Sequence, residues 1–298
     1  MQLKWLEDFV ALAQERSFTR AAELRHVTHP AFGRRIRALE SWAGTPLIER
    51  EAGPVKLTAA GQAFLDTALQ MTRHLAQSHD ELMAIAGRQG RTVTLCTGRT
   101  LARTIVADWL VRLRPYLADG ELRISTRSLA DAVHDLQHGL ADFSILYHHP
   151  SLVVPLDGRQ FEHVALATDR LLPVSRTDAS GAPMYFLEAG CAPVPYIAYD
   201  RTLALGRLVE DLLAHHPLAA HLKRLVECDS PDANYEYVRK GLGVSWLPWS
   251  VVHADVKSGL LAPAGGKGLE VKFDVRMFRP KRRLSGLAES LWSTIARR

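Results

Sequence analysis

The chain has 298 residues, of which 47% are hydrophobic and 23% charged, and its formal net charge is +5. This length suits two or three domains, and the composition is typical of a soluble globular protein rather than a disordered one. No apolar run approaches the ~20 residues that a membrane span requires, and the N-terminus MQLKWLEDFV mixes charged with apolar residues, unlike a signal peptide. We therefore expect a cytoplasmic protein with no membrane partner.

The N-terminal segment predicts two short helices that are joined to a third by a turn. Apolar residues at helical spacing indicate a helix over residues 3–13, and a second helix is expected over 19–25, with Ser17 or Thr19 as its N-cap. The third helix starts after residue 27, with Thr28 as the expected N-cap. Pro30 suits the first turn, where a missing N–H costs nothing.

Basic side chains gather on this third helix. Arg25, Arg34, Arg35 and Arg37 supply cations for phosphates or guanine edges, and no acidic residue lies between positions 23 and 40. Two helices crossing over a short turn, the second one basic, are typical of a helix–turn–helix. A small helical bundle with a solvated basic face is the competing interpretation.

Residues 45–58 predict a hairpin or wing, and residues 58–86 predict one long helix. Its apolar residues recur at spacings of four and three, a heptad pattern that favours a two-stranded coiled coil over a helix packed only on its own domain. The expected dimerisation residues are Phe64, Ala68, Met71, Leu75, Leu82 and Ile85.

Beyond the linker GRQGR (87–91), strands and helices alternate. This βαβ order predicts an α/β region with a parallel sheet. The strands are expected at 92–98, 121–127, 142–148, 171–176, 196–200, 222–228, 243–248 and 269–278, with helices between them and a final helix at 284–296.

The N-terminal residues closely resemble the LysR-type transcriptional regulators. That family has an aromatic residue in the first helix, then S-F, A-A, S-Q-P-A-x-S, I-x-x-L-E, G-x-x-L-F-x-R and L-T-x-A-G. The residues that correspond here are Phe9, Ser17, Phe18, Ala21, Ala22, Thr28, Pro30, Ala31, Ile36, Leu39, Glu40, Gly44, Leu47, Arg50, Leu57, Thr58 and Gly61. The runs KWLEDF and RRIRALE further resemble the hypochlorite-responsive subgroup.

The resemblance implies DNA contacts from Thr19, Thr28, His29, Pro30, Gly33, Arg34, Arg35, Arg37 and Arg50. Two of these residues depart from the family pattern, since His29 replaces the usual Gln and Gly33 the usual Ser. Gln can bind adenine through two hydrogen bonds, whereas a neutral His cannot do so in the same way. Either the operator preference is altered, or the two positions have drifted and the Arg residues supply the affinity.

The resemblance also implies an effector cleft between two α/β lobes. The positions that correspond are Thr100, Arg127, Ser128, Tyr147, His148, Tyr199, Asp200, Thr202, Trp246 and Pro248. Hydroxyl groups and helix N-termini suit a carboxylate or another small polar effector, and the aromatic residues would form the walls. Ordinary core packing is the alternative for each aromatic residue.

Redox and metal chemistry are the remaining candidates. Cys191 lies in a predicted loop and is the expected redox residue, Cys96 lies in an apolar strand, and the three Cys form no CxxC pair. The pattern HDLQH at 134–138 has the His spacing of zinc proteases but lacks their catalytic Glu, and a solvated helix face explains it more simply. We expect no enzyme activity, no metal and no cofactor.

The sequence thus predicts an effector-controlled regulator of transcription. The expected parts are a winged helix–turn–helix (1–57), a linker and dimerisation helix (58–91), and a regulatory domain resembling periplasmic binding proteins (92–298), whose lobes cover 92–165 with 269–298, and 166–268. The expected partners are double-stranded DNA, a small effector, a second copy forming a homodimer that assembles further to a tetramer, and RNA polymerase. A solute-binding or metal-dependent enzyme domain with an appended helical domain is the competing class.

Overall fold

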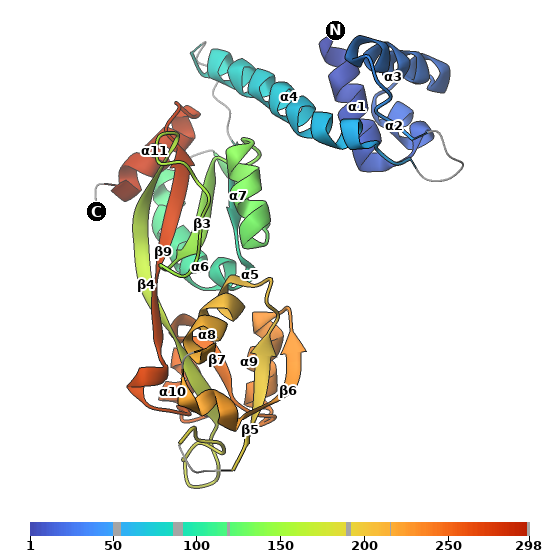
Figure 1. The fold of residues 1–298 in the computed structure, drawn as a ribbon. Coiled ribbons are helices and arrows are strands. Elements are labelled where there is room, and N and C mark those ends of the chain that lie inside the picture. Colours follow the sequence, from blue (N-terminus) through green and yellow to red (C-terminus); the bar gives the residue numbers. More distant parts are fainter. Residues whose placement is uncertain (50–54, 86–91, 118–119, 189–191, 215, 297–298) are drawn as a thin grey trace. The chain divides into compact units, whose positions relative to one another are not determined.

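The computed structural model describes residues 1–49, 55–85, 92–117, 120–188, 192–214 and 216–296 (Figure 1). The chain forms two compact units, residues 1–88 and 89–298. The long helix α4 therefore belongs to the first unit. No helix within the described ranges is long and apolar enough to cross a membrane.

Four helices build the first unit, and they follow the prediction closely. They are α1 (Leu3–Glu15), α2 (Phe18–Leu24), α3 (His29–Ala43) and α4 (Ala59–Ile85). Ser17 is the N-cap of α2, since its hydroxyl accepts a hydrogen bond from the Arg20 backbone N–H at 3.4 Å. Thr28 occupies the N-cap position of α3 but its side chain makes no capping bond, so Pro30 and the backbone alone define that start.

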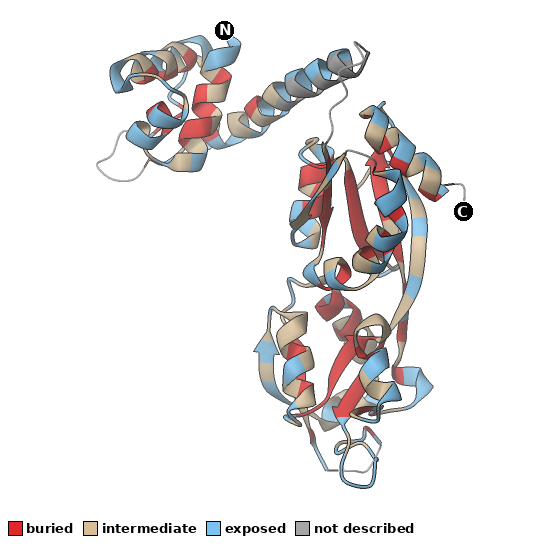
Figure 2. Ribbon diagram, turned by 180° about the vertical axis from the view of Figure 1, so that it is seen from behind, coloured by how far each residue is buried: buried red, intermediate tan, exposed pale blue. Residues whose placement is uncertain are grey.

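The core of this unit lies between α1, α2 and α3. Phe9, Leu12, Phe32 and Leu39 are fully buried there, and Figure 2 shows the buried residues on the inner faces of the helices. After α3 the chain forms an isolated antiparallel bridge between Ile48 and Leu57, which are the two ends of the predicted wing. A winged helix–turn–helix is therefore confirmed, and residues 50–54 lie outside the described residues.

The second unit contains a seven-stranded mixed sheet and a two-stranded sheet. The order in the large sheet is β2-β1-β3-β9-β4-β7, with β8 also paired to β4, and β5 pairs with β6. The strands are β1 (Thr92–Thr97), β2 (Glu121–Thr126), β3 (Phe143–His148), β4 (Phe161–Arg176), β5 (Val194–Tyr199), β6 (Leu222–Cys228), β7 (Ser245–Pro248), β8 (Leu261–Pro263) and β9 (Val271–Pro280).

Two long antiparallel strands connect the lobes of this unit. β4 has 16 residues, and β9 pairs with it from Phe161 opposite Pro280 to Leu171 opposite Val271. The parallel pairing expected from the βαβ order is confirmed for β1, β2 and β3, and β5 and β6 are also parallel, whereas β9 runs antiparallel to β3 and β4. The predicted lobe boundary at 165/166 falls inside β4, where the register shifts between Ala165 and Ala167.

Helices cover both faces of the large sheet in the first lobe, which comprises β1–β3, α5–α7 and α11. Alternate residues of β3 enter different clusters: Phe143 packs with the α11 side, where its ring stacks on Trp292 at 6.1 Å, and Leu146 packs with the α7 side. The helices of the unit are α5 (Arg99–Arg103), α6 (Ile105–Leu113), α7 (Leu129–Gln137), α8 (Ala204–Ala214), α9 (Pro231–Arg239), α10 (Trp249–Lys257) and α11 (Gly286–Ala296), with short 3-10 turns η1 (Arg114–Tyr116), η2 (Pro217–His221) and η3 (Lys267–Leu269).

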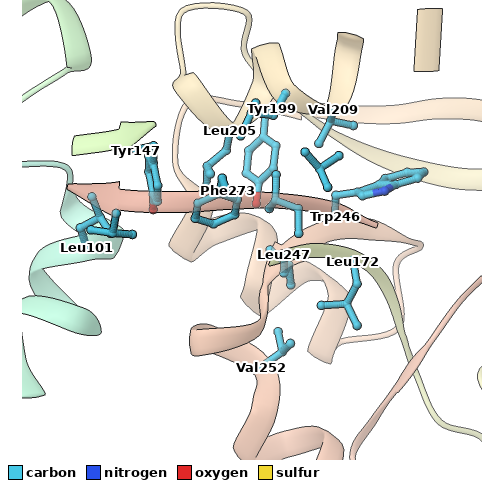
Figure 3. Packing of buried hydrophobic residues seen from close by; sticks show 14 of the residues in the cluster. Leu101, Tyr147, Leu172, Tyr199, Leu205, Val209, Trp246, Leu247, Val252 and Phe273 are labelled. Atoms are coloured by element: carbon cyan, nitrogen blue, oxygen red, sulfur yellow. The ribbon is translucent and has the colours of Figure 1, made fainter. Parts of the chain in front are cut away.

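The second lobe, which comprises β5–β8 and α8–α10, has its own packed centre. A parallel bridge between Tyr196 and Val244 ties β5 to the segment that enters β7. Trp246 on β7 is fully buried, and its ring meets Tyr196 edge-on at 5.6 Å (Figure 3). α10 and β8 were not predicted: α10 begins directly after the last residue of β7, and β8 has only three residues. The two-lobed α/β architecture itself is confirmed.

Candidate functional site

The first candidate site is the exposed face of α3. Its opposite face is apolar and buried through Phe32, Ile36 and Leu39, which fixes the helix on the core. The exposed residues of the stretch are Thr28, His29, Pro30, Arg34 and Arg37, and Thr19 on α2 is exposed as well. The N-terminal half of α3 therefore exposes a polar and basic surface to solvent.

Two of the predicted DNA-contacting cations have partners inside the domain. Asp8 on α1 is completely buried, and its two carboxylate oxygens accept from Arg25 Nε at 2.9 Å and from Arg35 Nη1 at 3.2 Å. Glu7 also accepts a hydrogen bond from Arg25. Arg25 ends α2 and Arg35 lies in the middle of α3, so one buried carboxylate ties the three helices together. Sequence reasoning missed Asp8, because an acid on an amphipathic helix usually faces solvent.

The two residues that depart from the family pattern differ in their surroundings. The His29 ring lies 5.9 Å from the Phe18 ring, so its imidazole is held partly by packing. Gly33 is half-buried, and an added Cβ would meet no atom within 4 Å. A larger side chain at position 33 therefore fits without moving a neighbour. Arg50 lies outside the described residues.

The start of the wing is held by α3 and α4. The Glu40 carboxylate accepts from the backbone N–H groups of Leu47 and Ile48 at 2.9 and 3.1 Å. Gly61 on α4 lies so close to this segment that an added Cβ would be 2.0 Å from the Leu47 carbonyl oxygen. These contacts give a structural role to Glu40 of the I-x-x-L-E pattern and to Gly61 of the L-T-x-A-G pattern.

The predicted dimerisation seam on α4 divides into two parts. Phe64 packs against Phe9 and Trp42 at 5.7 and 6.0 Å, and Ala68 is fully buried in the same domain. Ala68 therefore belongs to the first unit's own core, whereas Phe64 is half-buried and packs at the edge of the same core. Met71, Leu75 and Leu82 are 47%, 51% and 65% exposed, and they leave an apolar stripe on the single chain. The side chain of Ile85 lies outside the described residues.

The second candidate site is a pocket of about 390 Å³ between the two lobes. Five predicted residues line it: Thr100, Arg127, Ser128, Tyr147 and Thr202. The N-terminal ends of α7, α8 and α9 also reach it, through Leu129, Ala204 and Pro231. Backbone N–H groups point out of a helix N-terminus and favour a negatively charged group there, whereas Asp131 and Asp229, which also line the pocket, act in the opposite direction.

Charged groups in this pocket are held in fixed positions. Arg127 donates from Nε to Asp135 at 3.2 Å, and the Cys96 Sγ lies 3.5 Å from the same carboxylate oxygen. The Ser128 hydroxyl donates to Asp131 at 2.7 Å and accepts from the Asp131 backbone N–H at 3.1 Å, which caps α7. Sequence reasoning missed Arg99, Asp131 and Asp229 in the lining.

Two buried hydroxyl groups lie at the back of the pocket region. The hydroxyls of both Tyr147 and Tyr199 are buried; that of Tyr147 lies near the Thr100 side chain, and that of Tyr199 has no hydrogen-bond partner among the described residues. Burial raises the pKa of both phenols well above the usual value, so both are protonated donors. Figure 3 shows the two rings on either side of Leu205, and Phe273 meets the Tyr147 ring edge-on at 5.1 Å. Only Tyr147 also lines the pocket itself.

The other predicted effector residues lie outside this pocket. Trp246 donates from Nε1 to the Leu269 carbonyl at 2.8 Å in the core of the second lobe, and Pro248 is buried at the N-cap of α10. Asp200 accepts from the Thr202 hydroxyl at 2.6 Å, a bond that lowers the pKa of this exposed carboxyl group and shapes the turn before α8. His148 lines a different cavity. A position at the end of a strand does not show which side of the sheet a side chain faces, so these residues could not be told apart from the pocket residues by sequence.

Cys96 is buried in β1, as its apolar strand predicted, and His134 on α7 and His138 at its C-cap are half-exposed. Cys191 lies outside the described residues, and Met277 is fully buried. Burial raises the pKa of the Cys96 thiol to about 12, with Asp135 adding to the effect, so the reactive thiolate is suppressed. His134 and His138 stack with ring centroids 3.9 Å apart. Among the described residues, no group of three or more His, Cys, Asp or Glu could hold a metal ion.

A winged helix–turn–helix with an exposed basic helix, joined to a two-lobed domain with a polar pocket, defines a ligand-responsive DNA-binding regulator. The comparisons agree with this class. Residues 3–62 match the model of the bacterial regulatory helix-turn-helix protein, lysR family, and residues 86–298 match the LysR substrate binding domain. The chain therefore belongs to the LysR family of transcriptional regulators.

Three similar proteins match this chain over nearly its whole length. The transcriptional regulator YjiE of Escherichia coli is 26% identical over 98% of this chain and 93% of its own. The structure of Vibrio fischeri DarR in complex with DNA is 27% identical, covers 99% and 98% of the two chains and has a TM-score of 0.59. The structure of Salmonella typhimurium HypT, a hypochlorite-specific LysR-type regulator, is 26% identical, covers 98% and 96%, and has a TM-score of 0.60.

Proposed function

We propose that α3 enters the DNA major groove with its N-terminal half. In this proposal Thr28, His29, Pro30 and Gly33 face base edges, while Arg34 and Arg37 bind phosphates or guanines. The supporting observation is that the exposed residues on α3 lie opposite the buried Phe32, Ile36 and Leu39. Thr19 and Arg50 are proposed as flanking phosphate contacts. Arg35 acts mainly by fixing the helix, since Asp8 holds its guanidinium.

The effector proposed for the interlobe pocket is a small polar molecule that carries a carboxylate or similar anion. The N-termini of three helices (α7, α8 and α9), the Arg127 guanidinium and the Tyr147 side chain line one space. Thr100, Ser128 and Thr202 supply further hydroxyls.

Control of DNA binding would follow from a population shift. A ligand held by residues of both lobes stabilises the arrangement in which the lobes are close, and β4 and β9 are the strands that must bend or twist. The change is proposed to reach DNA through the oligomer. We propose a homodimer paired along α4 that assembles to a tetramer, contacts RNA polymerase and acts in the cytoplasm, where the chromosome is accessible. The domain limits 1–57, 58–91 and 92–298 belong to the same proposal.

A thermal-shift screen of the full chain against a library of small organic acids tests the effector proposal. A true effector raises the unfolding temperature of the wild type, and its affinity for the R127Q variant is at least tenfold lower. R159Q is the matched control, because Arg159 is exposed and does not line the pocket. An acid that stabilises wild type and R127Q equally binds elsewhere and contradicts the proposal.

Oxidant sensing is a second proposal, suggested by the likeness to HypT. Met184 is 46% exposed, whereas Cys96 and Met277 are buried, so the thioether of Met184 is the accessible sulfur among these three. Mass spectrometry after a hypochlorite pulse should show Met184 sulfoxide before any change at Cys96. A full reporter response from a variant with M184L and C191S would exclude these two residues as the sensor.

A further inference from the structure

A second cavity, of about 720 Å³, lies beside the strands that connect the lobes. It shares no lining residue with the effector pocket. Its lining comes from the end of β3, the middle of β4, the start of α10 and the first half of β9, namely His148, His149, Pro150, Thr168, Asp169, Arg170, Trp249, Lys272, Phe273, Asp274 and Arg276.

Three cations and two acids line this cavity, and most of them already have partners. Asp169 accepts from the backbone N–H groups of Arg170 and Ser250 at 2.7 and 3.3 Å. Asp274 accepts from Arg276 Nη2 at 2.8 Å. Arg170 pairs with Glu270 at 3.2 Å and lies over the Trp249 ring at 4.9 Å. The acids are therefore satisfied by donors of the protein.

The remaining donors belong to Lys272 and Arg276. Lys272 is exposed and has no ion-pair partner among the described residues. The Nε of Arg276 is buried and has no hydrogen-bond partner there. Both side chains line the cavity with a positive charge, and an oxyanion is the ligand that best matches the charge and geometry of an ammonium and a guanidinium group.

Histidines add a pH-dependent part to the same cavity. His148 and His149 line it, and His163 on β4 lies 6.3 Å from His148 and 3.4 Å from Arg276 Nη1. Burial lowers the pKa of His148, and Arg276, His163 and His149 lower it further while Asp274 acts in the opposite direction. A bound anion would reverse the effect of these cations, so His148 would take up a proton as the anion binds.

We propose that this cavity is an accessory binding site for a small oxyanion, held by Lys272, Arg276 and His148. It does not depend on the effector pocket, but the two are in contact through the cavity residue Phe273, whose ring meets Tyr147 of the pocket. An anion held by these residues contacts both β3 and β9. Its binding therefore stabilises one arrangement of the strands that connect the lobes.

Calorimetric titration of the full chain with sodium sulfate at constant ionic strength tests this site. Sulfate stays doubly charged between about pH 6 and 8, so a pH-dependent affinity reports protein groups alone. Sodium acetate forms a parallel arm that distinguishes carboxylates from tetrahedral anions. We expect sulfate to bind about threefold or more tightly at pH 6 than at pH 8, and H148Q to remove most of this difference.

Three variants locate the binding. K272Q should weaken sulfate binding about tenfold, because it removes one charged donor and disturbs no existing ion pair. K257Q, at an exposed Lys outside the cavity, and R127Q, in the effector pocket, should bind like the wild type. The proposal is overturned if K272Q binds like the wild type, if R127Q removes the binding, or if no heat is seen at about 20 mM of either salt. Loss of the effector response in R127Q with sulfate binding intact would separate the two sites.

Discussion

Asp8 on α1 and Arg35 on α3 form an ion pair in which the Oδ2 to Nη1 distance is 3.2 Å and the carboxylate is completely buried. Arg25, at the end of α2, binds the other oxygen of the same carboxylate. The crossing of the helix–turn–helix is thus fixed by one acid as well as by apolar packing. Of the four Arg residues between positions 25 and 37, Arg25 and Arg35 are therefore paired with an acid of their own domain.

The first prediction concerns the stability of the N-terminal unit. Replacing Asp8 with Asn leaves two guanidinium groups without their shared counter-charge, and breaking a buried pair costs about 3 kcal/mol or more. E7Q is the control, since Glu7 is 37% exposed and the loss of a partly solvated pair costs about 1 kcal/mol or less. Urea unfolding followed by circular dichroism checks this, and equal midpoints for D8N and E7Q would refute it.

A second prediction separates the cations that bind DNA from those that hold the helix. R34Q and R37Q should each lower the slope of log K against log salt by about 0.9, because each removes one phosphate contact. R35Q should lower the stability of the domain but change that slope much less. Fluorescence anisotropy with a labelled duplex at several salt concentrations measures the slopes. If R35Q also lowered this slope by about 0.9, Arg35 would have to leave Asp8 and bind a phosphate in the complex with DNA.

The third prediction addresses His29 and Gly33. An added side chain at position 33 meets open space, so G33A should stabilise α3 by about 0.5–1 kcal/mol, and G33S should fold normally. Binding selection on random DNA should give H29Q a different preferred base at one or two positions, since Gln can bind adenine bidentately. Identical preferred sites for the wild type, H29Q and G33S would favour drift at both positions.

The fourth prediction is a pH dependence of stability. The pKa of His148 is lowered in the folded protein, so as the pH falls below about 6.5 the unfolded chain takes up a proton first. The free energy of unfolding should therefore decrease toward acid, and H148Q should show a smaller decrease. H253Q changes an exposed His and should behave like the wild type. Urea titrations in chloride buffer at about pH 7.5 and about pH 5.5 provide the comparison.

The sequence alone was sufficient for the local elements of the N-terminal unit. Helical spacing, the N-cap Ser17 and the position of Pro30 each depend on neighbours within a few residues, and α1, α2 and α3 begin where they were expected within one residue. On α4 the heptad pattern includes Ala68, which is fully buried within its own unit. Packing on α1 and pairing with a second helix require the same spacing, so the pattern could not distinguish them.

In the second unit, contacts between residues far apart in the chain could not be predicted from the sequence. The continuous β4 could not be predicted, because its pairing with β9 joins residues about a hundred positions apart. Of the residues that strand ends suggested, Thr100, Arg127, Ser128, Tyr147 and Thr202 line one pocket, and their role in binding stays a prediction. Strand ends also suggested Trp246 and His148, which do not line it, since alternate residues of a strand face opposite sides of a sheet and the sequence does not say which side holds the ligand.

The measurement that tests the central claim most directly is DNA binding by the full chain to the region upstream of its own gene. Anisotropy titrations with this duplex and with a shuffled duplex of the same composition should differ at least a hundredfold in affinity near physiological salt. R34Q with R37Q should reduce both affinities. Equal affinity for the two duplexes, or binding unaffected by salt and by these two substitutions, would contradict a sequence-specific regulator that reads DNA through α3.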